Sequence, residues 1–275
     1  MHNSIALAID DSALAGRLEA AQAIAREAGR LAIQFRNRPE ALHITLKGPQ
    51  DFVTEADRAV ERLVRARLRE CFPGDTIIGE EYGGVVNDAA ALWAIDPIDG
   101  TSNFVAGRPE WCVSIGLLVA GRPTIGAIYQ PLLDDLYSAR TGQGASRNGV
   151  PISVSGRADL AQATVCFEYS VGTPIEHYLG MLERYLRTGG EYRRPGACTV
   201  ALAQIAAGSL DGFVELAINL WDVLAGIVLI REAGGWTNDF VRLEAPTMPY
   251  PMVAATPGIR DELLAVCNLD MSSGA

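Results

Sequence analysis

The run from 93 to 104, WAIDPIDGTSNF, constrains this chain more than any other stretch. Apolar residues lead directly into Asp96 and Asp99, and Pro97 stiffens the turn between these two carboxylates. A strand end that delivers both carboxylates to one point makes a site for a hard metal ion. The Gly100-Thr101-Ser102 step exposes backbone N–H groups and hydroxyls to an anion. The run therefore indicates metal-assisted chemistry on a phosphate.

Composition limits the class of partner. The 275 residues, 49% of them hydrophobic, can bury the core of one large domain or two smaller ones. The net charge of −10 argues against a nucleic-acid or membrane partner, because both are usually met by clustered Lys and Arg. A phosphate monoester carries about −1.5 to −2 charge near neutral pH. An acidic protein that binds a phosphate monoester needs local positive charge, which must come from metal ions if side chains do not supply it.

Cysteine and histidine usage narrows the choice of metal. The five cysteines are scattered and lack CxxC spacing, so we expect reduced thiols of a cytoplasmic protein, mostly core filler. No pair of the three histidines has ligand spacing, which argues against a zinc site and favours oxygen ligands for magnesium or manganese. Residues 1–9 show no signal peptide, and no apolar stretch approaches the ~20 residues that span a bilayer.

The order of elements predicts the fold class. We expect helices over 13–35, 54–71, 174–187, 198–207, 221–233 and 259–267. We expect strands over 76–78, 92–95, 111–119, 124–129, 136–139, 152–154, 163–167, 212–215 and 252–255. The prediction is an α/β (α+β) fold, a layered αβαβα sandwich with an antiparallel N-terminal sheet and a mixed, mainly parallel C-terminal sheet. We place most metal ligands in a part spanning 1–156, and Asp222 with the substrate contacts in a part spanning 157–275.

Two helix starts carry specific expectations. Asp11-Ser12 are cap candidates for the first helix, and Thr54 for the second. Four arginines at helical spacing in the second helix predict a solvated face. They are Arg58, Arg62, Arg65 and Arg69.

Each further acidic residue also has a structural explanation. Glu80, in a Gly-Glu-Glu step after a strand, fits a solvated loop, and Asp222 fits the first turn of a helix. Asp57 completes a capping box with Thr54. Asp99 alone fits a helix cap, but capping does not explain a second aspartate after an apolar strand.

Taken together, these residues resemble the inositol monophosphatase family of magnesium-dependent, lithium-sensitive phosphatases, which has histidinol-phosphatase-like members. The resemblance runs from about Lys47 to Gly235. Gly-Glu-Glu, the Asp-Pro-Ile-Asp-Gly-Thr-Ser-Asn-Phe run and Trp-Asp-Val…Glu-Ala-Gly-Gly occur in the family's order and spacing. The middle run is the most specific of the three.

The resemblance implies a role for each matching residue. Two or three Mg²⁺ ions, with Mn²⁺ as a substitute, would be held by Glu80, Asp96, Asp99, Asp222 and the backbone carbonyl of Ile98. The amides of Gly100 and Thr101 would hold phosphate oxygens. Asp57 would hydrogen-bond Thr101, which with Glu80 would position the attacking water and help deprotonate it. The family also implies a homodimer.

The substrate-facing positions depart from the family pattern. Gly196 is kept, but Ala197 stands where the family has a hydroxyl residue. Asn219 occupies a variable position that faces the substrate, and Glu215 falls where the family contacts substrate hydroxyls or an amine. Lys47 matches a family lysine only with a one-residue deletion before Asp51. Cys198 fits a small buried helix residue better than a reactive thiol.

Several functions stay open from the sequence. Inositol monophosphate is the first choice of substrate, because Glu215 and the Trp221-Asp222 pair fit that branch of the family. Histidinol phosphate is the main competitor. Fructose 1,6-bisphosphate and 3′-phosphoadenosine phosphates are less supported, because only Arg193 and Arg194 offer a place for a second phosphate. A non-catalytic scaffold is disfavoured by the complete set of acids. A calcium module is disfavoured by the lack of an alternating Asp/Asn loop.

Overall fold

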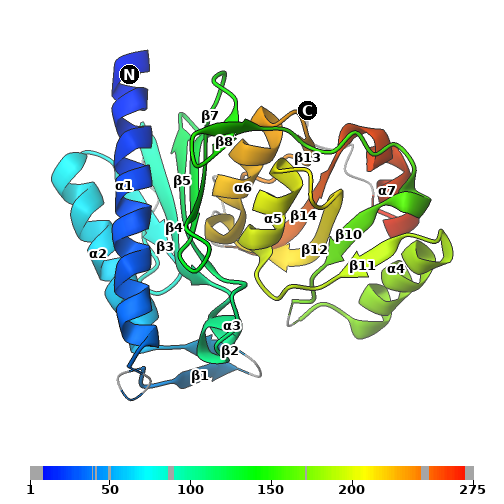
Figure 1. Cartoon of the computed structure of the whole chain (residues 1–275), viewed down its shortest axis with the longest axis horizontal. Helices are drawn as coiled ribbons and strands as arrows, with labels where there is room; N and C mark the ends of the chain where they lie inside the picture. The colour runs from blue at the N-terminus through cyan, green and yellow to red at the C-terminus, as the bar shows by residue number, and fades with distance from the viewer. Residues whose placement is uncertain are drawn as a thin grey trace, which may run out of the picture.

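Helices and sheets alternate in five layers in the computed structural model, which describes residues 9–38, 40, 42–48, 51–85, 90–170, 172–242 and 248–269 (Figure 1). The helices are α1 (Asp11–Arg36), α2 (Glu55–Cys71), α3 (Thr101–Val105), α4 (Ile175–Arg187), α5 (Cys198–Ala206), α6 (Leu220–Glu232) and α7 (Arg260–Cys267). The order of layers is α1 and α2, a seven-stranded sheet, α5 and α6, a five-stranded sheet, then α4 and α7. The predicted αβαβα sandwich is confirmed.

The seven-stranded sheet carries the acidic run. Its strands are β3 (Thr76–Gly79), β4 (Ala91–Asp99), β5 (Cys112–Val119), β6 (Arg122–Gln130), β7 (Asp135–Arg140), β8 (Ala145–Arg147) and β9 (Val150–Ile152), paired in that order. Strands β3 and β4 are parallel and the other neighbours are antiparallel. Every residue of β4 is buried, because helices cover both faces of the sheet. The register between β4 and β5 shifts between Asp96 and Asp99, where the strand leaves the regular ladder.

The strand expected over 152–154 is observed two residues earlier, as β9 (Val150–Ile152). A strand that we did not predict, β8, precedes it. The two strands form a hairpin closed by Asn148 and Gly149, both with positive φ. An Asn-Gly pair is the usual sequence of such a two-residue turn. A short hairpin, β1 (Thr45–Gly48) and β2 (Asp51–Val53), precedes α2.

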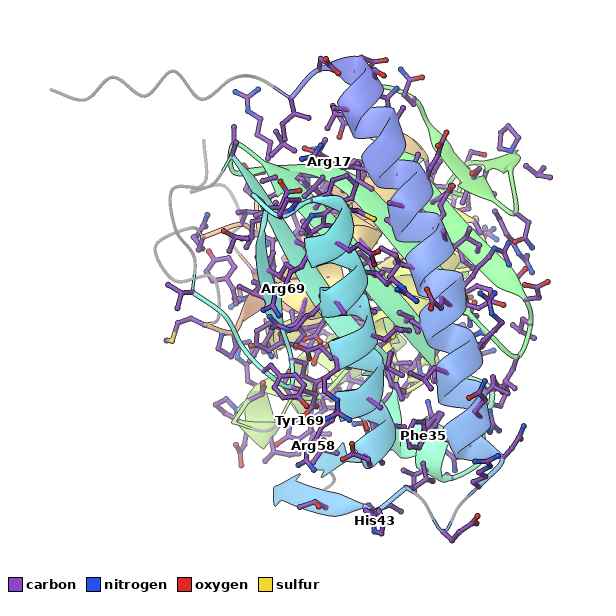
Figure 2. The ribbon with its side chains drawn as sticks, turned by 90° about the vertical axis from the view of Figure 1, so that its left-hand side faces the viewer. Arg17, Phe35, His43, Arg58, Arg69 and Tyr169 are labelled. Carbon is purple, nitrogen blue, oxygen red and sulfur yellow. The ribbon has the colours of Figure 1, made fainter. Side chains whose placement is uncertain are left out.

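Helices α1 and α2 lie side by side over the outer face of this sheet (Figure 2). The N-cap of α1 is Asp10, whose carboxylate accepts from the Ala13 amide, and not the expected Asp11 or Ser12. Thr54 caps α2 as predicted, in a capping box with Asp57.

The predicted arginine face of α2 is wrong at Arg65. Arg62 and Arg69 are exposed, but Arg65 is 8% exposed and donates to Glu61 at 2.6 Å. A side chain one turn away supplies the charge that permits its burial.

Helices α5 and α6 fill the space between the two sheets. Both are apolar on nearly every side, which fits a helix covered all round. Glycines let α6 approach the first sheet closely. A Cβ at Gly116 would lie 2.6 Å from Leu224, and one at Gly126 would lie 2.3 Å from the carbonyl oxygen of Ala225. This close packing places the start of α6 beside the end of β4.

The five-stranded sheet is mixed, with parallel and antiparallel pairings in equal number. Its order is β11 (Glu191–Arg193), β10 (Thr164–Phe167), β12 (Gly212–Ile218), β14 (Tyr250–Ala255) and β13 (Trp236–Thr237). Crossovers through α4 and α5 make β11, β10 and β12 parallel, whereas β14 pairs antiparallel with both of its neighbours. The expectation of a mainly parallel sheet is therefore wrong in this detail.

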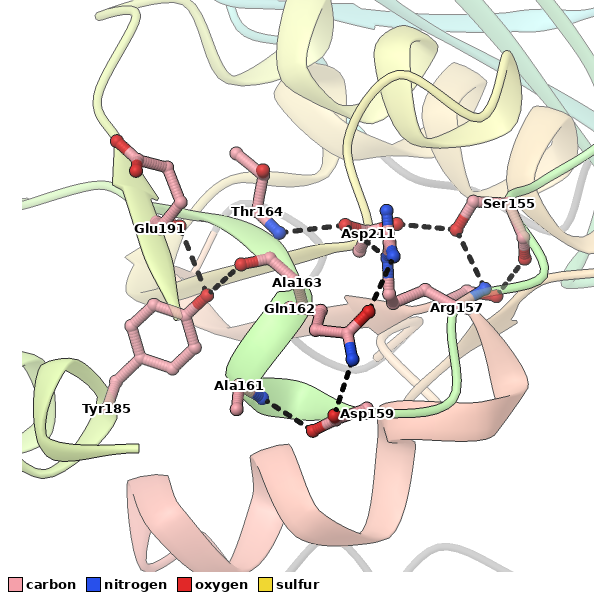
Figure 3. Close-up of polar contacts among 11 residues, drawn as sticks. Ser155, Arg157, Asp159, Ala161, Gln162, Ala163, Thr164, Tyr185, Glu191 and Asp211 are labelled. Atoms are coloured by element: carbon pink, nitrogen blue, oxygen red, sulfur yellow. Dashed lines mark hydrogen bonds and ion pairs between the residues drawn. The ribbon is translucent and has the colours of Figure 1, made fainter. Parts of the chain in front are cut away.

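Asp211 ties the segment entering the second sheet to that sheet (Figure 3). Its carboxylate accepts from the Ser155 hydroxyl and from the Thr164 amide at 2.7 Å. The hydroxyl of Thr256 donates to the Ser155 carbonyl oxygen in the same network. The proposed division near 156 stays a prediction.

All five cysteines are free thiols, as expected, and Cys112, Cys166 and Cys267 are buried. Among the described residues, no helix has the length and apolarity needed to cross a membrane. The expectation for residues 1–8 lies outside the described part of the chain.

Candidate metal and phosphate site

The end of β4 brings Asp96 into the centre of an acidic cluster. Asp96 is 2% exposed, and one of its oxygens accepts from the Ile98 amide at 3.0 Å. Burial raises the pKa of Asp96 well above its ordinary value, and the neighbouring acids raise that pKa further. Those acids are Glu80, Asp99, Asp222 and Asp57. The structure therefore gathers the five acids that the sequence analysis selected.

Asp99 is held at the N-terminus of α5. Its carboxylate accepts from the Thr199 amide at 2.8 Å, and the Cys198 thiol lies 3.3 Å from its other oxygen. The Cys112 thiol is 3.8 Å away. A carboxylate beside the unpaired amides of a helix start is favourable, although burial still raises the pKa of Asp99. Cys198 is thus part of the wall of the site and opens α5.

Asp222 reaches the same point from the first turn of α6. Its carboxylate accepts from the Asn219 amide at 3.0 Å, and its backbone carbonyl accepts from the Thr199 hydroxyl at 2.6 Å. Burial, followed by the charge of Asp99, raises the pKa of Asp222 to about 7. Asn219 acts here as the cap of α6, and its predicted contact with substrate is a separate, untested expectation.

Asp57 and Thr101 form a hydrogen-bonded pair beside the cluster. The Thr101 hydroxyl lies 3.1 Å from one Asp57 oxygen and 3.0 Å from the carbonyl oxygen of Ile98. The other Asp57 oxygen accepts from the amide and hydroxyl of Thr54. Burial raises the pKa of Asp57 to about 6 against the lowering effect of these bonds. Asp57 therefore both caps α2 and orients Thr101.

A buried ion pair fixes the turn that follows β3 and carries Glu80. The amide of Glu80 donates to the Ile95 carbonyl oxygen at 3.2 Å, so Glu80 lies beside β4. Glu61, which is 0% exposed, accepts from the Glu81 amide at 2.7 Å and from Arg65. Arg65 also donates to the carbonyl oxygens of Ile77 and Gly83. Sequence reasoning missed this pair. The i, i+4 spacing of Glu61 and Arg65 could have indicated an ion pair on one face of α2.

The Gly100 position permits the turn that leads into α3. Gly100 is the N-cap of α3 with a φ of 87°, a conformation that favours glycine. A Cβ there would lie 2.7 Å from the Glu110 carbonyl oxygen and 2.9 Å from the Ala197 Cβ. Asn103, which we did not single out, donates to the carbonyl oxygens of Glu110 and Pro195. The predicted phosphate seat thus packs directly against the 195–197 segment.

The predicted substrate side is built around two further carboxylates. Glu215 accepts from the Ser170 hydroxyl at 2.7 Å. Burial raises its pKa well above the ordinary value, and the charges of Glu168, Asp222 and Asp99 raise that pKa further. Glu215 is thus close enough to Asp222 and Asp99 for their charges to act on it, and its contact with the alcohol of the substrate stays a prediction.

Glu168 is a residue that sequence reasoning missed. It is 7% exposed, accepts from the Gly196 amide at 2.7 Å, and pairs with Arg194 at 3.1 Å. Arg193 instead pairs with Glu191 at the surface. Ala197 is buried, and the side chain of Lys47 lies outside the described residues. Arg194 therefore anchors the Gly196 turn through Glu168.

The donor chemistry fits a divalent cation, although the carboxylates are not arranged as a finished coordination shell. Within the described residues, no three His, Cys, Asp or Glu side chains form a group that could hold a metal ion as placed. Asp99 directs both oxygens at α5 and the cysteine thiols. The buried acids nevertheless raise one another's pKa values, and a bound cation would remove that repulsion. Glu80, Asp96, Asp99, Asp222 and the Ile98 carbonyl oxygen are the groups that would hold it.

The family model described as the inositol monophosphatase family matches residues 14–266, and the chain belongs to that family. The chain is similar to "Nus factor SuhB" of Pasteurella multocida, at 35% identity over 87% of this chain and 91% of that protein.

Two solved structures show the same fold. The suhB protein of Bartonella henselae has a TM-score of 0.85 and 30% identity, covering 94% of this chain and 100% of that one. A Thermotoga maritima IMPase has a TM-score of 0.81 and 31% identity, covering 92% of this chain and 97% of that one.

Proposed function

We propose that this protein is a magnesium-dependent phosphatase that hydrolyses a small phosphate monoester, with inositol monophosphate as the first choice of substrate. The observation that carries the proposal is the convergence of four acids on Asp96, with the Thr101–Asp57 pair beside them. Family membership supports phosphatase chemistry at this point. Two or three Mg²⁺ ions, or Mn²⁺ in their place, would neutralise phosphate charge and activate the attacking water when bound.

Residues of the chain would position the attacking water and bind the phosphate. Thr101, oriented by Asp57, would position the attacking water together with Glu80, and the two residues would help to remove a proton from that water. The backbone N–H groups of Gly100 and Thr101 would hold phosphate oxygens. Asp96 and Asp99 are 2% and 7% exposed, so the end of β4 proposed to hold the metal is shielded from bulk water. The reaction would proceed by in-line attack of water on phosphorus, without a phosphoenzyme, and would break the bond between phosphorus and the ester oxygen. The leaving alkoxide would lie near Asp99 and Asp222 and take its proton from a water there.

The choice of alcohol would be made on the Glu215 side. Glu215 would accept hydrogen bonds from the hydroxyls of inositol, or from the amine of histidinol phosphate, which is the alternative substrate. The other proposed contacts are Gly196, Ala197 and Asn219. A second phosphate is less favoured, because Arg193 and Arg194 are engaged with Glu191 and Glu168.

We further propose a cytoplasmic homodimer with no nucleic-acid or membrane partner. The net charge of −10 is the reason for excluding these partners. The similar protein of Pasteurella multocida bears the name "Nus factor SuhB".

A phosphate-release panel with and without Mg²⁺ tests the proposal. The substrates are inositol 1-phosphate, histidinol phosphate, fructose 1,6-bisphosphate and 3′-phosphoadenosine 5′-phosphate. We expect Mg²⁺-dependent release that is fastest with inositol 1-phosphate, and Glu215→Gln should alter the ratio of kcat/KM values between substrates. Absence of release from all four substrates would contradict the proposal. An unchanged ratio in Glu215→Gln would remove Glu215 from the recognition site.

A further inference from the structure

This chain has no side-chain hydroxyl at Ala197, but it has one at Thr199, two residues later. The family pattern places a hydroxyl residue where this chain has Ala197, and Ala197 is buried against the phosphate seat. Thr199, in the first turn of α5, is 0% exposed. Its hydroxyl is hydrogen-bonded to the backbone of Asp222, a member of the acidic cluster. This threonine therefore has a different task from the hydroxyl that Ala197 lacks.

Thr199 contacts two carboxylate residues that come from separate elements. Its amide donates to Asp99, at the end of β4, at 2.8 Å. Its hydroxyl donates to the backbone carbonyl of Asp222, in the first turn of α6, at 2.6 Å. One residue thus links β4, α5 and α6 where two proposed metal ligands meet.

The other described contacts between α5 and α6 include close apolar packing. The two helices pack closely, and a Cβ at Gly226 would lie 2.5 Å from Leu202. Such apolar packing sets the distance between the helices, but it is non-directional and permits small shifts along their axes. A buried hydrogen bond is directional and resists such a shift. The hydrogen bond from the Thr199 hydroxyl is made to the backbone of Asp222, which is the residue whose position matters.

We propose that Thr199 is a positioning residue that sets the separation of the Asp99 and Asp222 carboxylates, and with it the affinity for the divalent cation that they share. The inference rests on the proposed metal-dependent function. Groups that orient metal ligands typically change metal affinity by about 10–100-fold when they are removed. Loss of the hydroxyl should therefore act on metal binding more than on the bound phosphate.

The test compares Thr199→Val, Thr199→Ala and Thr199→Ser with the wild-type chain. Thr256→Val is the matched control, because Thr256 is 1% exposed and its hydroxyl also donates to a backbone carbonyl, that of Ser155. Mg²⁺ and Mn²⁺ affinities are measured by titration calorimetry, and the Mg²⁺-induced rise in Tm is measured separately. Unfolding in urea gives the stability of each variant.

We expect Thr199→Val and Thr199→Ala to weaken Mg²⁺ binding by about tenfold or more. Thr199→Ser should keep wild-type affinity, and Thr256→Val should lose stability without losing affinity. Alanine serves if the valine variant does not fold. Wild-type Mg²⁺ affinity in a folded Thr199→Ala or Thr199→Val chain would overturn the inference. Failure of the wild-type chain to bind Mg²⁺ would instead overturn the proposed function, so the two failures are distinguishable.

Discussion

The hydroxyl of Thr101 lies 3.1 Å from a carboxylate oxygen of Asp57, a residue 44 positions earlier in the chain. The same carboxylate caps α2 through Thr54. The helix start and the proposed water-positioning hydroxyl are thus held by one buried group. Activity at Thr101 should therefore depend on Asp57, the same residue that completes the capping box of α2.

Thr101→Val should remove activity while leaving the chain folded. Valine has nearly the shape of threonine but cannot donate to Asp57 or contact the attacking water. We expect kcat to fall by about 10²–10⁴-fold, the usual range for a proton-transfer group. Steady-state phosphate release measures the loss, and far-UV circular dichroism checks the fold. Thr101→Ser is the control and should keep most of the activity; equal losses in both variants would contradict the role of the hydroxyl.

The metal-free protein should lose stability as the pH rises from about 4 to about 7. Burial raises the pKa of Asp57 to about 6 and that of Asp222 to about 7, so the folded chain holds protons that the unfolded chain releases. Their ionised forms are therefore costly above those values. Tm measured in EDTA should show that Asp222→Asn gains stability relative to wild type as the pH rises. A difference that is constant from pH 4 to pH 8 would contradict the assigned pKa shift.

Added Mg²⁺ should reverse this loss of stability. The cation binds the ionised carboxylates and the folded chain, so mass action should raise Tm. The rise should be larger at pH 8 than at pH 5, where protons compete for Asp222 and Asp57. Differential scanning fluorimetry at both values measures it, with Asp222→Asn as a control that should respond less. An equal rise at both pH values would show that Mg²⁺ binds elsewhere.

Arg65→Met should destabilise the chain far more than Arg69→Met. Arg65 is buried with Glu61, so its removal leaves an unpaired buried charge, which costs about 3–5 kcal/mol. Arg69 is exposed on the same helix, and its removal should change stability by less than about 0.5 kcal/mol. Urea unfolding measures both free energies. Equal effects would contradict the structural role of the Glu61–Arg65 pair.

Gly100→Ala should cost more stability than Gly142→Ala. Both glycines have positive φ, near 87° and 80°, so alanine carries about 1–2 kcal/mol of backbone strain at either position. Only at Gly100 does the added Cβ meet other atoms within 4 Å, so we expect a further cost of about 1–3 kcal/mol there. Gly100→Ala should also abolish phosphate release, and Gly142→Ala should not. Full activity in folded Gly100→Ala would exclude the proposed phosphate seat.

Local patterns predicted most helices and strands, because hydrophobic period and capping residues are encoded within each segment. Thr54 capped α2 as its sequence indicates, and the apolar run before Asp96 formed a buried central strand. The expected excess of parallel pairings in the second sheet was wrong, because the pairing of segments that are distant along the chain leaves little local signal. The acids of the candidate site were found because several signals agreed with a family pattern.

The residues that support those acids could not be found in the same way. Thr199, Glu168 and Glu61 act through contacts with backbone groups that are distant along the chain. Arg65 looked like a member of a solvated stripe, because its spacing does not reveal which turn of α2 faces the Glu80 loop. Tertiary packing decides such roles, and it overrides the preference of a single residue for solvent.

Phosphate release by Asp96→Asn shows whether Mg²⁺-dependent hydrolysis needs the carboxylate at the end of β4. Asparagine keeps the size of the side chain but removes the charge at the centre of the acidic cluster. The wild-type chain should release phosphate from inositol 1-phosphate in Mg²⁺ and stop in EDTA. Asp96→Asn should remain folded, lose the Mg²⁺-induced rise in Tm and release no phosphate above background. Undiminished Mg²⁺-dependent turnover in folded Asp96→Asn would contradict the proposed phosphatase site at Asp96.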